Sequence, residues 1–509
     1  MKNALSKISV FSKKIIYLIA LIGTVMIALF STLYYLHMHL VSDEREIVVN
    51  SPIIILFVVA ELLVLCVLRK ILNNCKENSI FLFFIVIYVL LGLFLIFNVD
   101  GLLRGDQQII YEHARILNSG SYEVLENGRY LTLNPVQLGY ATYVRLLIKI
   151  VDSTKILFVA NLIWTAIIYF IIWKISCLVI DSSLCRKYII LLEFSFLPTF
   201  FIILYAYGQV PGYSLILLAT YFFIRYLKTH NIINMIPFFV FFILACILKN
   251  NFMIAGIVFS LVLLFDVLSN YIDWKALLWI PVILVSMVYP ARAIADSYRI
   301  ASGIDFGEGE PISSYFAMGL HWDEYAVTGG GYDGYTFDNY YDSGFDSELA
   351  DQKAKENLKE SINYFVSNPS YAIQFFKYKF IATWCEPLFG TVEIGPLECF
   401  GQYTHNIFVQ SIYTDGYLYL IAEKFMNAYN IIIFSFCAIF CFRMIFKRKR
   451  INGYEVMPAL YFIGGMIFHL ISETQARYMP IYVVPLIIYV AVVLVKIQDK
   501  GLEKINKNN

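Results

Sequence analysis

Charged residues are scarce in this chain. They make up 15% of its 509 residues, against about 25% in a typical soluble domain, whereas 59% of the residues are hydrophobic. The formal net charge is only +1, which argues against nucleic acid as a partner. The low charge and high apolar content exclude an ordinary soluble protein and indicate an all-α, polytopic integral membrane protein.

Motifs of nucleotide and metal chemistry are also lacking. The sequence has no Walker loop, Rossmann fingerprint or nucleophile elbow, which disfavours nucleotide-driven chemistry, and no cofactor is expected. A divalent metal has no support, because the spacing of four late acids does not match an EF-hand loop. A solvated, tyrosine-rich loop is the favoured interpretation of these four residues: Asp333, Asp338, Asp342 and Asp346.

The nine cysteines show no C-x-x-C spacing and lie mostly in apolar stretches. Cys385 and Cys399 share one predicted external segment, so a disulfide and two unpaired thiols both stay open.

Long apolar runs are what the sequence has in abundance. A bilayer core needs about 20 apolar residues per helix. About twelve transmembrane helices are expected, at Ile15–Leu36, Pro52–Leu68, Ile80–Phe97, Ile156–Cys177, Tyr188–Tyr205, Gly212–Tyr226, Ile233–Leu248, Phe252–Leu268, Ala276–Ala293, Ile431–Phe446, Val456–Ile471 and Ile481–Val495.

The cationic residues predict the orientation of the chain in a cell membrane. Cytoplasmic loops carry an excess of Lys and Arg. If the spans alternate, the cationic groups fall on one side, so both termini are expected in the cytoplasm. These groups are Lys2, Lys7, Lys13, Lys14, Arg69, Lys70, Lys76, Arg186, Lys187, Arg225, Lys228, Lys275, Lys447–Arg450, Lys496, Lys500, Lys504 and Lys507.

The expected organisation is a helical bundle with two long external segments. The first segment, residues 99–155, contains two amphipathic stretches, Gln107–Leu117 and Gln137–Ile150. The second, residues 297–430, begins with Gly303–Asp346, which has little helical signal. Transmembrane regions of residues 1–98, 156–296 and 431–497 surround these segments, and residues 498–509 form a cytoplasmic tail.

The second segment continues with a predicted helix, Glu348–Val366, a turn at Asn368–Ser370 and an aromatic stretch, Tyr371–Trp384. Long ordered loops on one face of a rigid bundle are where function usually lies. We therefore expect the functional surface to be extracytoplasmic.

Three external residues are candidates for chemistry. Asp106 could take a proton from a hydroxyl group, or it could simply cap the helix that follows it. Lys249 could bind a phosphate, or it could be an interfacial lysine whose ammonium reaches water. Arg477 is expected on the external side, although Lys and Arg are usually more frequent on the cytoplasmic side. It could bind phosphate through two hydrogen bonds, or it could pair with Glu473.

These residues stand within motifs that resemble the GT-C class of membrane glycosyltransferases, near the protein mannosyltransferase and aminoarabinose transferase branch. The similar motifs are Asp106–Ala114, Asn134–Tyr140, Lys249, Asn368–Trp384 and Gln475–Pro480. The resemblance extends from about Phe81 to Val495, and it rests on the order of the motifs and on their shared side of the membrane.

The resemblance implies an inverting transfer of a monosaccharide from a polyprenyl-phosphate donor. The acceptor would be a cell-envelope glycan, lipid or protein. Asp106 would be the catalytic base, and Lys249 and Arg477 would bind the donor phosphate. Weaker substrate-binding candidates are Tyr111, Glu112, Asn134, Gln137, Gln475 and Tyr478.

Two other functions stay open. A polymerase of lipid-linked repeats would rely on arginine-rich external loops, whereas the late segment here is acidic and poor in arginine. A transporter or flippase would show inverted halves or broken helices, of which the sequence gives no sign. The acids Glu61 and Glu193 lie within apolar runs and keep transport open.

Overall fold

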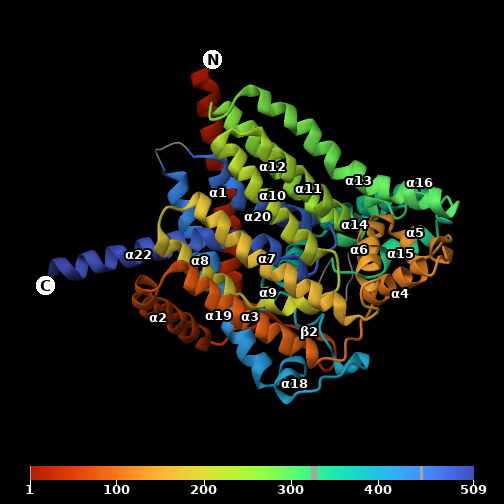
Figure 1. Cartoon of the computed structure of the whole chain (residues 1–509), viewed down its shortest axis with the longest axis horizontal. Coiled ribbons are helices and arrows are strands. Elements are labelled where there is room, and N and C mark those ends of the chain that lie inside the picture. The colour runs from red at the N-terminus through yellow and green to blue at the C-terminus, as the bar shows by residue number, and fades with distance from the viewer. Residues whose placement is uncertain (1, 322–329, 448–450, 509) are drawn as a thin grey trace.

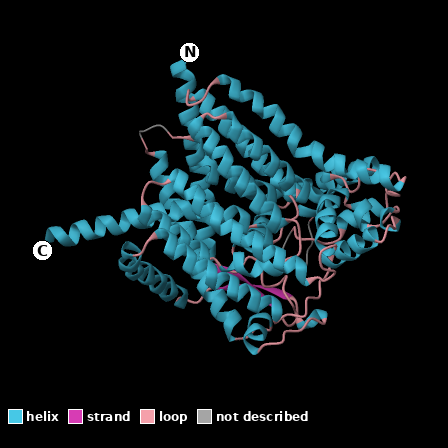
Figure 2. Cartoon of the chain, viewed as in Figure 1, coloured by secondary structure: helices cyan, strands magenta, loops and turns pink. Residues whose placement is uncertain are grey.

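The computed structural model describes residues 2–321, 330–447 and 451–508, and most of those residues are helical (Figures 1 and 2). Within these ranges nine helices are long and apolar enough to cross a membrane. A tenth span exists if the pair Ser183–Ser195 and Leu197–Leu204, bent by 56°, counts as one. The fold is thus that of an all-α membrane protein.

Helices occupy all twelve positions at which spans were expected. They are α1 (Lys2–Leu33), α2 (Ile53–Asn74), α3 (Glu77–Phe97), α7 (Lys155–Val179), α8 (Ser183–Ser195) with α9 (Leu197–Phe201), α10 (Gln209–Thr229), α11 (Met235–Leu248), α12 (Met253–Leu268), α13 (Trp279–Ser302), α19 (Tyr417–Ile445), α20 (Gly453–Ile471) and α22 (Ile487–Asn508).

Two of these helices are less suited to crossing a membrane than the sequence runs suggested. The helix α11 is short, with 14 residues. The helix α2 carries Glu61, Arg69 and Lys70 within its 22 residues. A count of twelve spans therefore stays a prediction.

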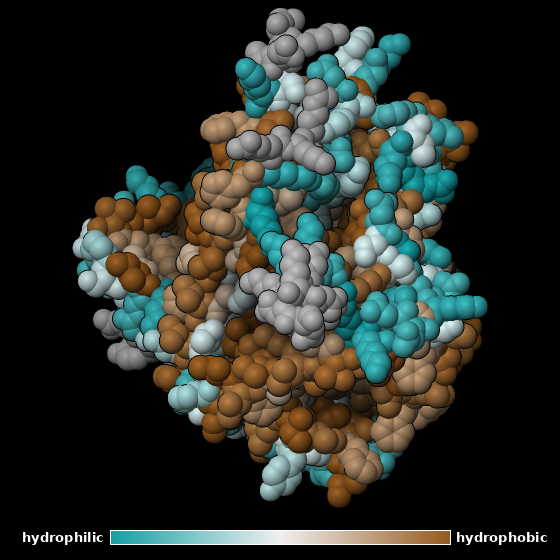
Figure 3. All heavy atoms as spheres, turned by 90° about the vertical axis from the view of Figure 1, so that its left-hand side faces the viewer, coloured by the Kyte–Doolittle hydropathy of each residue, from teal (hydrophilic) through white to brown (hydrophobic). Residues whose placement is uncertain are grey.

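A broad apolar surface covers the outside of the bundle. Large exposed hydrophobic side chains follow one another along α2, α3 and α13, for example Leu56, Leu63, Leu82, Leu90 and Val285. One face of the molecule shows wide hydrophobic areas, with hydrophilic side chains concentrated in its upper and central parts (Figure 3). Exposing so much apolar area to water is unfavourable, whereas contact of the same area with the acyl chains of a bilayer is not.

The two predicted external segments fold mainly into helices of 4 to 21 residues. The first holds α4 (Asp106–Asn118), α5 (Tyr130–Leu133) and α6 (Leu138–Ile148). The second holds α14 (Ile312–Gly319), α15 (Tyr335–Tyr341), α16 (Ser347–Ser367), α17 (Pro369–Trp384) and α18 (Ile407–Tyr413). In Figure 1 the helices α4, α5, α15 and α16 lie at the right, whereas the two termini lie at the top and left.

The amphipathic stretches and the late helix were predicted within one or two residues, as α4, α6 and α16. The expectation of little helix in Gly303–Asp346 was wrong, because α14 and α15 form there. Asn339 of α15 donates to Ser314 Oγ at 3.0 Å and to the carbonyl oxygen of Ala350 at 2.9 Å, so tertiary contacts support a helix that local propensity does not favour. Residues 322–329 of this stretch and Arg448–Arg450 lie outside the described residues.

The sequence analysis missed a β-hairpin near the end of α1. Strands β1 (Tyr34–His39) and β2 (Glu44–Val49) pair antiparallel where the first span was expected to end at Leu36. Asp43 adopts a positive φ of 58° in the turn. The hairpin packs against the late segment, where the amide of Leu36 donates to the carbonyl oxygen of Cys385 at 3.2 Å.

Lys13 was expected among the cytoplasmic cations, but its side chain is fully buried in α1. Its ammonium lies 2.8 Å from Asp266 Oδ1 of α12 and donates to the carbonyl oxygen of Ile451 at 2.9 Å. The ion pair therefore joins the first helix to the later bundle. All nine cysteines, Cys385 and Cys399 included, are free thiols.

Candidate active site

Asp106 lies at the first position of α4, where the chain leaves a turn at Gly105 with a φ of 55°. Gly105 occupies the N-cap position and no side chain caps the helix, so the capping interpretation of Asp106 was wrong. The carboxylate is exposed, and its Oδ2 accepts a hydrogen bond from the hydroxyl of Tyr207 at 3.3 Å. The hydroxyl of Tyr130 also interacts with Asp106. Asp106 therefore presents a carboxylate that tyrosine hydroxyls hold in place.

Lys249 follows directly on α11, in extended backbone with φ −160° and ψ 121°. Its ammonium lies 4.2 Å from the centre of the Tyr207 ring. Desolvation lowers the pKa of Lys249 to about 8, and the nearby Arg477 lowers it too, although Asp106 and Glu473 oppose the shift. Lys249 is thus an enclosed cation that shares Tyr207 with the carboxylate of Asp106.

Two glycines let the chain that carries Lys249 approach its neighbours. A Cβ atom at Gly139 of α6 would lie 2.0 Å from the carbonyl oxygen of Ile247, and one at Gly208 would lie 2.1 Å from that of Leu248. Neither distance is sterically tolerable. The close backbone approach at these two residues sets the position of Lys249.

Arg477 lies in the 3₁₀ turn Ala476–Tyr478 (η8) between α20 and α21 (Pro480–Val483). Its guanidinium is 5.9 Å from the centre of the Tyr205 ring. The carboxylate within ion-pair distance, among the described residues, is that of Glu393 at 3.9 Å, and not that of Glu473. The backbone carbonyl oxygen of Arg477 accepts from Gln209 Nε2 at 2.9 Å, which links this turn to the start of α10.

Glu473 belongs to the same charged group as Asp106, Lys249 and Arg477, and it lies in the loop just before Arg477. Burial raises the pKa of Glu473, and the cations of Arg477, Lys249 and Lys379 act in the opposite direction. Its backbone amide donates to the carbonyl oxygen of Tyr315 at 3.0 Å. The cluster therefore holds cations and carboxylates from five separate parts of the chain.

A layer of tyrosines connects these charges, and the sequence analysis did not assign it to the site. The rings of Tyr205 and Tyr207 stack with their centres 5.4 Å apart. Tyr205 also forms a side-chain hydrogen bond with Arg477. The available signal was the Tyr-Ala-Tyr sequence of residues 205–207 just after the bent helix pair, but Tyr205 was placed inside an apolar run.

A second carboxyl group near Asp106 was also missed. Glu310 Oε2 accepts from the hydroxyl of Tyr315 at 3.0 Å, and the same hydroxyl lies 3.0 Å from Asn134 Oδ1. Burial raises the pKa of Glu310 to about 7, and the charge of Asp106 adds to the shift. Glu310 lies in the stretch that was expected to be irregular and solvated, so its sequence gave no reason to select it.

The weaker candidates divide between the site and the surface. Asn134 contacts Tyr315 as above, and Gln137 donates to the hydroxyl of Tyr207. Tyr111 instead donates to Asp152 Oδ1 at 3.1 Å, and Glu112 accepts from Gln108 at 2.8 Å on an exposed face of α4.

The last two of these candidates lie on the loop of Arg477. Gln475 forms a side-chain hydrogen bond with Glu473. The ring of Tyr478 stacks on His469 with the ring centres 5.5 Å apart. Both side chains therefore border the charged cluster.

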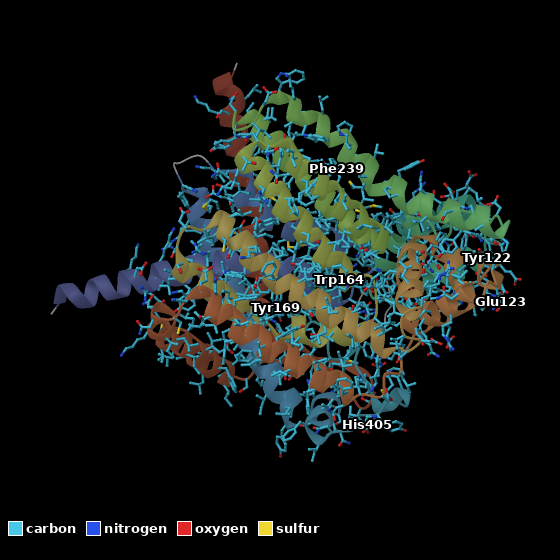
Figure 4. All side chains as sticks on the ribbon, viewed as in Figure 1. Tyr122, Glu123, Trp164, Tyr169, Phe239 and His405 are labelled. Carbon is cyan, nitrogen blue, oxygen red and sulfur yellow. The ribbon has the colours of Figure 1, made fainter. Side chains whose placement is uncertain are left out.

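The remaining candidates lie elsewhere. Glu193 is buried in α8, and neither carboxylate oxygen has a hydrogen bond within the described part of the chain. The helix pair Ser183–Ser195 and Leu197–Leu204 bends by 56° just after Glu193, so the expectation of no broken helix was wrong. His405, in the second predicted external segment, lies beside α18 and far from Tyr122 and Glu123 of the first, so these parts of the two segments are apart (Figure 4). Over the described ranges no three His, Cys, Asp or Glu residues gather as metal ligands.

No model of a known protein family matches the chain, and no curated protein is significantly similar to it in sequence. The fold is that of a multi-pass helical membrane protein, and the cluster brings Asp106, Lys249 and Arg477 together around stacked tyrosines.

Proposed function

We propose that this protein is a membrane glycosyltransferase of the GT-C type, which uses a polyprenyl-phosphate monosaccharide as donor. One observation carries the proposal, namely that Asp106 and Lys249 contact the same side chain, Tyr207. The sequence motifs named these residues from segments 143 positions apart, and a carboxylate base beside a phosphate-binding cation is what such a transfer needs.

The proposed chemistry assigns a role to each charge. Asp106 accepts the proton of an acceptor hydroxyl, whose oxygen forms a bond to the anomeric carbon of the donor sugar. The bond from that carbon to the phosphate oxygen breaks, and its electron pair leaves with the phosphate. Lys249 and Arg477 stabilise the negative charge that grows on the leaving group. Because the attack comes from the face opposite the phosphate, the configuration is inverted.

The proposal includes a place in the cell and a set of partners. The site would face the extracytoplasmic side, with both termini in the cytoplasm and twelve spans in a cell membrane. The acceptor would be a cell-envelope glycan, a lipid or a protein. The chain's own chemistry supports a phosphate-linked donor, since the cations of Lys249 and Arg477 lie against the stacked rings of Tyr207 and Tyr205.

A direct test compares Asp106→Asn with Asp305→Asn in lipid vesicles that contain a polyprenyl-phosphate sugar and envelope acceptors. Asp305 is the control, because it is also an exposed aspartate, with a side chain 92% exposed, in the second predicted external segment. The base variant should lose transfer by about 10²–10⁴-fold, and the control should keep it. Full transfer by Asp106→Asn would refute the assignment.

Transport of a lipid-linked glycan is a second candidate, and Glu193 favours it. A buried acid beside a broken helix is typical of transporter binding sites, and α8 bends by 56° into α9 just after Glu193. Under this alternative, Glu193→Gln would abolish movement of a labelled lipid across the bilayer, whereas Asp106→Asn would leave it unchanged. Under the transferase proposal, Glu193→Gln keeps transfer chemistry in detergent.

A further inference from the structure

A large cavity lies inside the bundle, apart from the Asp106 cluster. Its volume is about 440 Å³, within the range of sites that bind small molecules. Side chains of α7, α10, α12, α19, α20 and α22 surround it, and most are aliphatic or aromatic, such as Ile172, Ile216, Val258 and Ile488. Its composition suits a hydrocarbon chain and not a sugar.

Cations gather at one end of this cavity. Arg443, Lys447 and Lys496 belong to its lining, and the ammonium of Lys228 lies 5.8 Å from the ring of Tyr454, another lining residue. Glu455 pairs with Lys447 at 2.9 Å and so offsets one of the four charges. The exposed Asp181 also lies near Tyr454. Because four cations face these two acids, this end has an excess of positive charge.

Arg443 is a lining cation with one unsatisfied guanidinium nitrogen among the described residues. Its Nη1 atom is buried and has no hydrogen bond among the residues that the structure describes. A buried guanidinium nitrogen without an acceptor is costly, and a phosphate oxygen is the acceptor that guanidinium groups fit best. The lining therefore supplies an apolar chamber and, at its end, a guanidinium with an unsatisfied nitrogen.

The far end of the cavity is closed toward the Asp106 cluster. Tyr461 lines that end and contacts Tyr482, with ring centres 4.9 Å apart. Tyr482 in turn contacts His469, which stacks on Tyr478 beside Arg477. This aromatic layer separates the cavity from the proposed donor site, so an occupant here is not the sugar donor bound at Asp106.

We propose that the cavity binds one acyl chain of an anionic membrane phospholipid, whose phosphate contacts Arg443 and Lys496. The lipid would come from the leaflet on the side of the two chain termini, and its negative headgroup would balance the excess positive charge. Its chain would fill the space between α10 and α20. The helix α10 begins at Gln209, which donates to Arg477, so the lipid would also stabilise the turn that carries this arginine.

The test uses the full-length protein, stripped of lipid in a neutral detergent, and follows Tm and native mass spectra during titration with phosphatidylglycerol. We expect one retained lipid per chain and a rise in Tm of about 3 °C or more. Phosphatidylcholine and inorganic phosphate should give neither effect, because the first lacks net charge and the second lacks a chain.

Two variants probe the two parts of the site. Arg443→Gln with Lys496→Gln should weaken phosphatidylglycerol binding about tenfold or more, whereas the charge-matched pair Lys70→Gln and Lys275→Gln should not. Thr220→Phe, which fills the cavity from α10 and keeps the cations, should abolish the retained lipid. Equal responses to phosphatidylglycerol and phosphatidylcholine, or full binding by either cavity variant, would overturn the proposal.

Discussion

The ammonium of Lys249 lies 4.2 Å from the centre of the Tyr207 ring, and the hydroxyl of that same ring donates to Asp106. One tyrosine therefore contacts the cation through its face and the carboxylate through its edge. The two opposite charges stay close without a direct ion pair, so each is available to a substrate.

The pH dependence of donor use should report Lys249. Its pKa is lowered to about 8, so the ammonium loses its proton at a lower pH than an ordinary lysine does. The value of kcat/KM for the donor should therefore fall as pH rises through about 8. Lys249→Arg should keep its charge and extend activity to higher pH.

Unfolding does not account for that loss at high pH. A lysine with a lowered pKa in the folded state releases its proton before the unfolded chain does, so its own contribution makes the fold more stable between about pH 8 and the ordinary pKa of 10.5. A thermal scan over the same range checks this sign. An unchanged profile in Lys249→Arg would contradict the assignment of the pH effect to Lys249.

Gly208→Ala should move Lys249 and weaken the fold. The added Cβ would lie 2.1 Å from the carbonyl oxygen of Leu248, so the backbone must shift, at a cost of about 1–3 kcal/mol. We expect a lower Tm and a higher KM for the donor. Gly501→Ala is the control, because a Cβ at Gly501 meets no atom within 4 Å.

Glu393→Gln should loosen Arg477. The carboxylate of Glu393 lies 2.5 Å from Arg45 and 3.9 Å from Arg477, so it holds the two guanidinium groups together. Its neutral analogue should raise the donor KM several-fold with little change in kcat, since Arg477 keeps its charge. Glu398→Gln, at an exposed position nearby in the chain, should leave both constants unchanged. A fall in kcat alone would argue against a positioning role.

The pair of Lys13 and Asp266 should matter more when broken than when replaced. Lys13→Met alone leaves a buried carboxylate without its cation and should cost about 3–5 kcal/mol. The double variant with Asp266→Leu should regain much of that loss, because no charge is then buried. The measurement is the Tm of the single and the double variant in the same detergent. An equal fall in Tm in both variants would show that the ion pair itself stabilises the bundle.

Periodicity and apolar run length were sufficient for much of the fold. They placed helices at every expected span and gave α4, α6 and α16 nearly to the residue. They missed the hairpin, because Tyr34–Leu36 continues the apolar composition of α1 while its backbone pairs with Ile47–Val49. Strand pairing depends on a partner segment elsewhere in the chain, and the length of an apolar run gives no information about such a partner.

The site was less predictable than the fold. Charge in a predicted external position, together with the order of the motifs, selected Asp106, Lys249 and Arg477. Tyr207 and Glu310 have ordinary sequence surroundings, and their importance comes from long-range contacts with Asp106. Pairing with Glu473 was the local alternative to phosphate binding by Arg477, whereas the carboxylate that Arg477 approaches is Glu393, 84 residues earlier in the chain.

The hairpin also has a consequence for the order of events during synthesis. His37 of β1 lies 2.5 Å from Glu423, although 386 residues separate them. The N-terminal strands emerge from the ribosome early, but the surface that covers them is made only when four-fifths of the chain exists. Until then the edges of the hairpin are uncovered, and other strands can pair with them. A chaperone bound to one of these edges would protect the first fifty residues while the rest of the protein enters the membrane.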